Sequence, residues 1–213
     1  SPFTLIMQTT YYCGTEDGEH FTEFSEQEHI FDALVDYYDA INDGEIDGPR
    51  MRVSGPSLGI TGGHCDNNLL PAHYDARSEG VADGPWAVRA KVREVIKYGA
   101  DLIKFCATGG VLSKGTSVGN QQFTLEEMQA LVDEAQKFGK RVAMHAHGID
   151  GISKAVQAGV NTLEHGTYLY EDPNVIQQMV ERGVFLVPTL KVGWDIIHAK
   201  DSNIPNWIMQ KNI

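Results

Sequence analysis

The feature of the sequence that most constrains its fold is a unit of helix, glycine and strand that occurs four times between residues 85 and 190. In each unit a helix with an apolar stripe ends near a glycine, and a short, almost continuously apolar strand follows. The strands are expected at residues 101–106, 141–146, 161–165 and 184–190. Apolar strands that alternate with helices predict a parallel sheet with both faces covered.

A sheet of this kind occurs in doubly wound folds and in (β/α)8 barrels, and polar residues near the ends of the strands distinguish these two architectures. A doubly wound nucleotide-binding sheet usually carries a glycine-rich phosphate loop, and the sequence contains neither G-x-G-x-x-G nor G-x-x-x-x-G-K-[ST]. In a (β/α)8 barrel, active-site residues come from the C-terminal ends of several strands. Lys104, His145, His147, His165 and Thr189 occupy such positions. We therefore predict an α/β fold that forms part of a (β/α)8 barrel of the TIM type.

The charge is unevenly distributed along the chain. Residues 1–49 contain 12 acidic residues and no Lys or Arg, so they account for the whole formal net charge of −12. We expect residues 1–30 to form a separate acidic segment and residues 31–213 to form the barrel domain. The lack of a basic patch argues against nucleic acid as a partner. No apolar run approaches the ~18 residues of a membrane span and no signal peptide is evident, so we expect no membrane partner and a cytoplasmic location.

A long polar loop is expected at residues 56–84, and loops of this length usually carry function or are disordered. The loop contains His64 and one of three cysteines, Cys13, Cys65 and Cys106. The cysteines are odd in number, scattered and without C-x-x-C spacing. They predict neither a disulfide framework nor a thiolate zinc site.

Three histidines follow two neighbouring strands. Imidazole is a common zinc ligand, and adjacent strand ends bring such ligands together at the mouth of a barrel. His145 and His147 are two residues apart, so they share a face if the strand continues that far. Each histidine could instead be an ordinary hydrogen-bonding group at the rim, but with His165 the cluster favours a metal site.

Lys104 lies within an apolar strand and has three possible roles. Its side chain could extend to the solvent at the barrel mouth. A buried amine with a lowered pKa could instead form a Schiff base with a carbonyl substrate, or take up carbon dioxide as a carbamate that bridges two metals. The neighbouring histidines favour the carbamate.

Several motifs in order resemble the amidohydrolase superfamily, and most closely its imidazolonepropionase-like and Xaa-Pro dipeptidase-like branch. They are G-P-R at 48–50, V-S-G-P at 53–56, I-T-G-G-H at 60–64, I-K-F-C-A-T-G-G at 103–110, V-A-M-H-A-H-G at 142–148 and L-E-H-G-T at 163–167. The resemblance covers roughly residues 35–190. It implies a distorted (β/α)8 barrel with two divalent metals, usually zinc, that activate a water to hydrolyse C–N bonds of small amide, dipeptide-like or cyclic amide substrates.

The resemblance also assigns roles to residues. Lys104 matches the lysine that takes up carbon dioxide and bridges the metals as a carbamate, and His145 and His165 match metal ligands. His147 has no ligand counterpart, so the substrate contacts are expected from His64, His147 and Tyr168.

Two elements of the family pattern do not occur in these 213 residues. No H-x-H precedes residue 145, although the family has one on its first strand. Asp195 and Asp201 lie too close to the seventh strand to be the aspartate of the eighth, which is a ligand and the general base. We therefore expect strands three to seven of a barrel, an internal fragment that alone neither holds two metals nor turns over.

Two other functions stay open. A lysine at a strand end also fits a Schiff-base aldolase on a TIM barrel, in which Lys104 would react with a carbonyl substrate. The chain could alternatively be a non-catalytic, degenerate remnant. Assembly into a homo-oligomer is possible as well.

Overall fold

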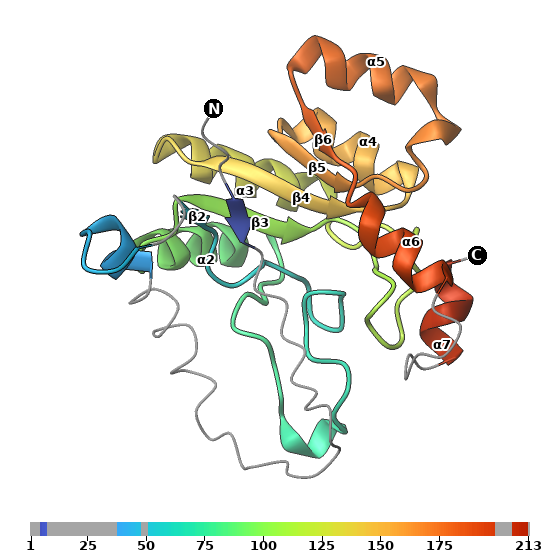
Figure 1. Cartoon of the computed structure of the whole chain (residues 1–213), viewed down its shortest axis with the longest axis horizontal. Helices are drawn as coiled ribbons and strands as arrows, with labels where there is room; N and C mark the ends of the chain where they lie inside the picture. The colour runs from blue at the N-terminus through green and yellow to red at the C-terminus, as the bar shows by residue number, and fades with distance from the viewer. Residues whose placement is uncertain (1–4, 8–37, 48–50, 199–205, 213) are drawn as a thin grey trace.

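The computed structural model describes residues 5–7, 38–47, 51–198 and 206–212. At its centre is a four-stranded parallel sheet whose strands lie side by side in chain order (Figure 1). The strands are β3 (Leu102–Cys106), β4 (Arg141–Ala146), β5 (Thr162–His165) and β6 (Phe185–Val187). The predicted parallel α/β fold is therefore confirmed.

The helices between the strands also follow one another in chain order. They are α2 (Pro85–Lys97), α3 (Leu125–Lys137), α4 (Ile149–Ala158) and α5 (Pro173–Arg182). α2 contacts α3, α3 contacts α4, and α4 contacts α5. A doubly wound sheet is defined by a point at which the strand order reverses. The described strands show no such reversal.

A second parallel pair lies beside β3. β1 (Leu5–Met7) pairs with β2 (Met51–Val53), and Asp101 connects β2 to the start of β3. The N–H of Asp101 donates to the carbonyl of Val53 at 2.8 Å, and the Asp101 carboxylate accepts from the N–H of Val53 at 3.0 Å. Leu58 then forms a parallel bridge with Phe105. The segment that follows β2 therefore runs along the free side of β3.

The ends of the helices follow from local sequence signals. Thr124 and Glu127 form a capping box at the start of α3. The Thr124 hydroxyl accepts from the N–H of Glu127 at 3.2 Å, and the Glu127 carboxylate accepts from the N–H of Thr124 at 2.8 Å. Pro85 and Pro173 occupy the first turns of α2 and α5. Gly183 ends α5 at φ 67°, a left-handed conformation that glycine adopts without steric cost.

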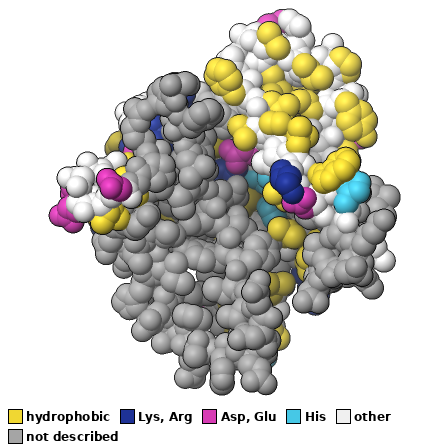
Figure 2. Space-filling view, in the orientation of Figure 1, with side chains coloured by type: hydrophobic (Ala, Val, Ile, Leu, Met, Phe, Trp, Pro, Cys, Tyr) yellow, Lys and Arg dark blue, Asp and Glu magenta, His cyan; other side chains and the backbone are white. Residues whose placement is uncertain are grey.

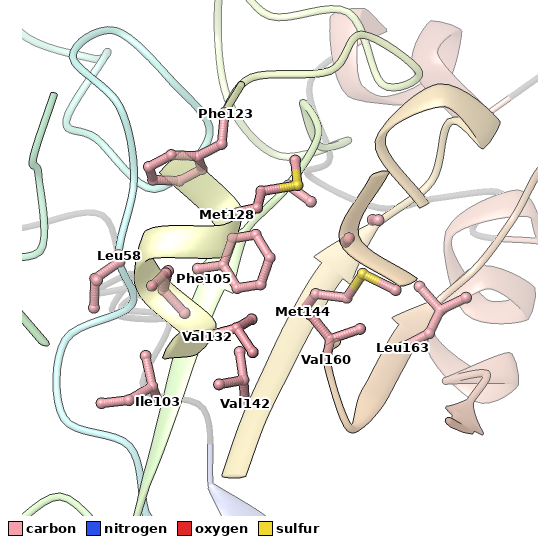
Figure 3. Packing of buried hydrophobic residues seen from close by; sticks show 14 of the residues in the cluster. Leu58, Ile103, Phe105, Phe123, Met128, Val132, Val142, Met144, Val160 and Leu163 are labelled. Atoms are coloured by element: carbon pink, nitrogen blue, oxygen red, sulfur yellow. The ribbon is translucent and has the colours of Figure 1, made fainter. Parts of the chain in front are cut away.

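The hydrophobic core lies between the sheet and its helices (Figure 3). Strand residues Ile103, Phe105, Val142, Met144 and Leu163 are all fully or almost fully buried. They pack against residues of the helices and loops, among them Leu58, Phe123, Met128, Val132 and Val160. The rings of Phe105 and Phe123 meet edge to face with their centroids 5.7 Å apart. Each fully buried side chain of this size contributes about 1.5–3 kcal/mol, so this layer is a main source of stability.

The last strand is shorter than predicted. β6 ends at Val187, and residues up to Leu190, expected as strand, lead into helix α6 (Leu190–His198). β6 is also exposed, with 68% of Phe185, 45% of Leu186 and 39% of Val187 accessible. Figure 2 shows hydrophobic side chains gathered on the part of the surface formed by α5 and β6. An apolar edge of this kind is a surface that another strand or segment would cover.

The expectation for the cysteines is wrong. Cys65 and Cys106 form a disulfide, with their Cα atoms 6.0 Å apart and a sequence separation of 41. Sequence spacing did not show the pairing because the fold of the 56–84 loop back onto β3 brings the two residues together. Cys13 lies outside the described residues.

The remaining described elements are short. They are α7 (Asn206–Met209) and the 3-10 turns η1 (Ala72–Tyr74), η2 (Leu169–Glu171) and η3 (Gln210–Asn212). Residues 38–42 are helical, and most of the acidic segment 1–30 lies outside the described residues. None of the helices in the described part of the chain is long and apolar enough to cross a membrane.

Candidate functional site

The register of the sheet places three polar side chains on one face. Cys106 lies opposite His145, and His145 lies opposite Glu164. Directly paired residues share a face, and Lys104 is two residues before Cys106 on β3, so Lys104, His145 and Glu164 all project from the face away from the helices. All three are buried, with 1%, 3% and 6% of their surfaces exposed. The sheet thus carries ionisable groups on one face and its apolar core on the other.

His165 joins this group through an unusual backbone conformation. Its register partner is Ala146, so strand alternation alone would direct it to the helix side. However, His165 has a φ of 71°, in the left-handed region that a residue with a Cβ rarely adopts. Its ring lies with its centroid 4.7 Å from that of His145. Backbone strain of this kind, worth about 1–3 kcal/mol, is typical of functional sites.

The three histidines form a compact cluster. One ring nitrogen from each of His145, His147 and His165 lies within 4.8 Å of the others. The ring centroids of His145 and His147 are 4.8 Å apart, and His147 stacks on His165 at 5.0 Å. These are the residues that the sequence predicted to converge, and the separations suit nitrogen ligands around one metal ion.

Among the described residues, one nitrogen of each ring has a hydrogen-bond partner. The Nδ1 atoms of His147 and His165 bond to the hydroxyls of Thr167 and Thr189 at 2.7 Å and 2.6 Å. His145 Nε2 lies 3.2 Å from the Gly109 carbonyl, which only accepts, so Nε2 must carry the proton. His145 therefore offers Nδ1, whereas the other two rings offer Nε2. Support of a ligand through its second nitrogen is usual at metal sites.

Burial keeps the imidazoles neutral. It lowers the pKa of His147 to about 4 and is the largest cause that lowers the pKa of His165 to about 3. The pKa of His145 lies well below its usual value, mainly because of burial and then because of its neighbouring histidines. Neutral imidazole is the form that binds a metal, so the cluster is ready to coordinate at neutral pH.

Lys104 and Glu164 form a buried ion pair beneath the histidines. Beyond this pair, Lys104 Nζ and Glu164 Oε1 have no hydrogen-bond partner among the described residues. Burial lowers the pKa of Lys104 to about 7, so a large share of the amine is uncharged near neutral pH. An uncharged amine is the form that adds to a carbonyl carbon or to carbon dioxide.

The three residues expected to contact substrate lie around the cluster. The ring of His64, from the long loop, is 4.2 Å from that of His145, and its Nδ1 is buried without a partner among the described residues. Tyr168 follows β5 and donates its N–H to the carbonyl of His147 at 3.0 Å. His147 is itself part of the cluster, so the structure makes it a possible third nitrogen ligand as well as a substrate contact.

Sequence reasoning missed several contributors to the site. Glu164 directly precedes His165 and lies opposite His145 in the register of β4 and β5. Had the two strands been aligned by their apolar residues, this pairing would have indicated that Glu164 shares the polar face with His145. Thr167 supports a histidine ring and stands two residues after His165. The Cys65–Cys106 disulfide depends on a contact distant in sequence and left no signal.

Known proteins are similar to this chain in sequence and in fold. The profile of the Amidohydrolase family matches residues 21–211. Ochratoxinase from Aspergillus niger is 39% identical over 168 residues, which are 72% of this chain and 35% of that protein. A solved structure of a Xaa-Pro dipeptidase with bound methionine superposes with a TM-score of 0.75 and 40% identity, over 84% of this chain and 45% of that one.

The crystal structure of A. niger ochratoxinase also superposes, with a TM-score of 0.71 and 34% identity, over 83% of this chain and 45% of that chain. The chain therefore spans between about a third and a half of the length of these relatives. The family match covers most of the chain and includes the strands that carry Lys104, His145 and His165. This protein belongs to the amidohydrolase family.

Proposed function

We propose that the chain forms part of the active site of a metal-dependent hydrolase that cleaves C–N bonds in small amide, dipeptide-like or cyclic amide substrates. Family membership supports hydrolase chemistry. The observation that carries the metal part is the cluster of three neutral imidazoles with free ring nitrogens, next to a buried lysine. Relatives described as a Xaa-Pro dipeptidase and an ochratoxinase support the class of substrate.

The proposed metal ligands are Lys104, His145 and His165, with His147 available as a further nitrogen. The donor set fits zinc, which accepts imidazole and carboxylate-type oxygen ligands. Beyond their ion pair, the buried atoms Lys104 Nζ and Glu164 Oε1 have no hydrogen-bond partner among the described residues, which supports a site completed by a bound ligand. When bound, a divalent metal lowers the pKa of a water and polarises a carbonyl group.

Lys104 is proposed to react with carbon dioxide. The neutral amine attacks the carbon, an N–C bond forms, and the nitrogen loses a proton, which gives a carbamate with two oxygen donors. The pKa of about 7 supports this role because the reacting form is then abundant. The carbamate would bridge the two zinc ions that we expect in the whole enzyme.

His64, His147 and Tyr168 are proposed to hold the substrate. All three can donate hydrogen bonds to a carbonyl or carboxylate group. His64 and His147 contact or adjoin His145, and Tyr168 adjoins His147, so a substrate held by them would lie beside the proposed ligands.

We also propose that β2 to β6 are strands three to seven of a (β/α)8 barrel. Sequential parallel strands and the apolar, exposed edge of β6 support this arrangement. The 213-residue chain contains no second H-x-H, so by itself it is expected to hold one metal rather than two and to lack turnover.

Zinc binding tests the proposal directly. The 213-residue chain, saturated with zinc and then dialysed, is expected to retain about one equivalent by elemental analysis. His145→Asn and His165→Asn should lose it, whereas His73→Asn, which changes an exposed histidine, should retain it. Equal zinc retention in all variants would refute the site. Two equivalents together with dipeptide hydrolysis would refute the expected inactivity.

The aldolase alternative rests on the same lowered pKa of Lys104, since an uncharged amine also attacks a carbonyl substrate. Borohydride reduction in the presence of a small aldehyde or ketone should leave Lys104 unmodified if the hydrolase proposal holds. Covalent trapping at Lys104, located by peptide mass spectrometry, would favour the aldolase.

A further inference from the structure

The Cys65–Cys106 disulfide joins the long polar loop to the strand that carries Lys104. Its Cα separation of 6.0 Å lies inside the usual disulfide range of about 4.4–6.8 Å. Cys65 is partly exposed, whereas Cys106 is fully buried in β3. The bond is therefore accessible from the loop side and anchored on the sheet side.

The position of each cysteine relates the bond to the histidine cluster. Cys65 directly follows His64 in sequence, and Cys106 lies opposite His145 in the register of β3 and β4. The disulfide thus connects the neighbour of His64 to the strand position beside His145. The ring centroids of these two histidines are 4.2 Å apart.

The other contacts of His64 fix its backbone better than its ring. Its N–H donates to the Gln122 side chain at 3.0 Å, but its Nδ1 has no partner in the described part of the chain. The ring lies directly over Gly110, where a Cβ atom would come within 2.2 Å of it. The ring therefore keeps its place through close packing, which depends on the loop staying against β3.

We propose that the Cys65–Cys106 disulfide is a redox-sensitive positioning element that holds His64 against His145. In the oxidised chain the loop is covalently fixed to β3. When a dithiol reduces the bond, the S–S bond breaks, two cysteine thiols form, and the dithiol becomes a disulfide with transfer of two electrons and two protons. The part of the loop around Cys65 can then move away from β3 and take His64 out of the site, while Leu58 stays paired with β3.

Hydrogen bonds within the loop limit the movement that follows reduction of the disulfide. The carboxylate of Asp66 accepts from the N–H groups of Gly62 and Ser78 at 2.8 Å and 3.0 Å. The Asn68 side chain donates to the Gly63 carbonyl at 2.8 Å. These bonds do not involve β3, so they survive reduction. Leu58 also keeps its backbone hydrogen bonds to Lys104 and Cys106 of β3, at 2.8 Å and 2.9 Å, so reduction frees only the part of the loop around Cys65. Disulfides of this kind persist in oxidising compartments and are reduced in the cytosol, so the surroundings would set the state of His64.

The first test counts thiols. Alkylation of the folded chain without reductant, followed by peptide mass spectrometry, should leave Cys65 and Cys106 unmodified, and prior treatment with a dithiol should make Cys65 reactive. Cys13→Ser serves as a control that removes the third cysteine and leaves the disulfide in place. Alkylation of Cys65 before reduction would overturn the proposal.

The second test measures His64 itself. Diethyl pyrocarbonate should modify His64 about fivefold or more faster after reduction, since a freed loop opens locally. Exposed His73 is the internal control and should react at one rate throughout. Cys65→Ser should show the faster rate without any dithiol and should not respond to it. An unchanged His64 rate on reduction of the wild-type chain, with the protection of β4 amides from hydrogen exchange intact, would overturn the proposal.

Both readouts use the chain without metal. The position of the Cys65–Cys106 disulfide beside His64 does not depend on the proposed hydrolase function. Only its consequence for substrate binding rests on that function. A chain that fails to bind zinc but shows the redox-dependent change at His64 would refute the metal proposal and keep the positioning role.

Discussion

Two groups of ionisable side chains, each built around a buried carboxylate, lie on opposite faces of the sheet and differ in how well their charges are satisfied. On the helix side, the Glu134 carboxylate accepts from Arg89 at 3.0 Å, from Arg93 at 2.6 Å and from Lys137 at 3.3 Å. On the other side, Lys104 pairs with Glu164, and beyond this pair Lys104 Nζ and Glu164 Oε1 have no hydrogen-bond partner among the described residues.

The difference separates a structural use of buried charge from a functional one. A fully bonded carboxylate such as Glu134 joins two helices, α2 and α3, and its pKa falls to about 2, chiefly because of the hydrogen bond from Arg93. A charge pair with unused hydrogen-bonding capacity is costly, and folded proteins retain such groups mainly where a ligand completes them. The comparison predicts that substitutions in the two groups will change stability in opposite directions.

The largest effect is expected from replacing the unsatisfied pair. Lys104→Met combined with Glu164→Gln should raise the free energy of unfolding of the metal-free chain by about 1–4 kcal/mol, because the desolvation cost of two charges is removed. Urea denaturation followed by circular dichroism measures it. The matched change in the helix network, Arg93→Met with Glu134→Gln, should instead lower the stability. A loss of stability in both double variants would erase the distinction.

Zinc should stabilise the chain through the histidine cluster and not through the Glu134 network. Zinc at about 100 times its dissociation constant is expected to add about 2.7 kcal/mol to the unfolding free energy. Chelation with EDTA should remove the gain, and His145→Asn should abolish it because a ligand nitrogen is lost. Glu134→Gln should lower the baseline and leave the zinc increment unchanged, as thermal denaturation with and without zinc will show. An increment that survives in His145→Asn would contradict the assignment.

Removal of the satisfied carboxylate should cost a moderate amount. Glu134→Ala is expected to lower the unfolding free energy by about 1–3 kcal/mol, since three charge-assisted hydrogen bonds are lost while their cationic partners can rehydrate. Glu126→Ala, on the exposed side of the same helix, is the control and should change stability little. Equal effects of the two substitutions would show that the network contributes nothing.

The two groups should change the free energy of unfolding in different pH ranges. The pKa of Glu134 is lowered from 4.5 to about 2 in the folded chain, so its stabilisation is complete above pH 4.5 and is lost as the pH falls towards 2. The pKa of His147 is lowered from 6.5 to about 4, so protonation of the unfolded chain destabilises the fold earlier, between pH 6.5 and 4. The unfolding free energy of Glu134→Gln should fall less steeply in the lower pH range. That of His147→Gln should fall less steeply in the upper range, to which His145 and His165 also contribute. Identical pH profiles in both variants would contradict these assignments.

Local patterns predicted much of the fold because they record local physics. The capping box at Thr124 and Glu127, the prolines that open α2 and α5, and the glycine after α5 are decided by neighbouring backbone groups. The strand Arg141–Ala146 was expected at its observed bounds, since a continuous apolar run of this length fits few other structures. β6 was overextended because its apolar run continues into a helix, and hydrophobicity alone does not mark that change.

The sequence by itself determined the order of parallel strands and helices, and the strand ends at which Lys104, His145 and His165 stand. Only the tertiary structure decided that a left-handed residue turns His165 towards His145, that Glu164 pairs with Lys104, and that Cys65 meets Cys106. The physical reason is the distance along the sequence over which each interaction acts. Periodicity and capping act over a few residues, whereas the partner of a buried charge or thiol is chosen by strand register and loop packing between segments far apart in the chain.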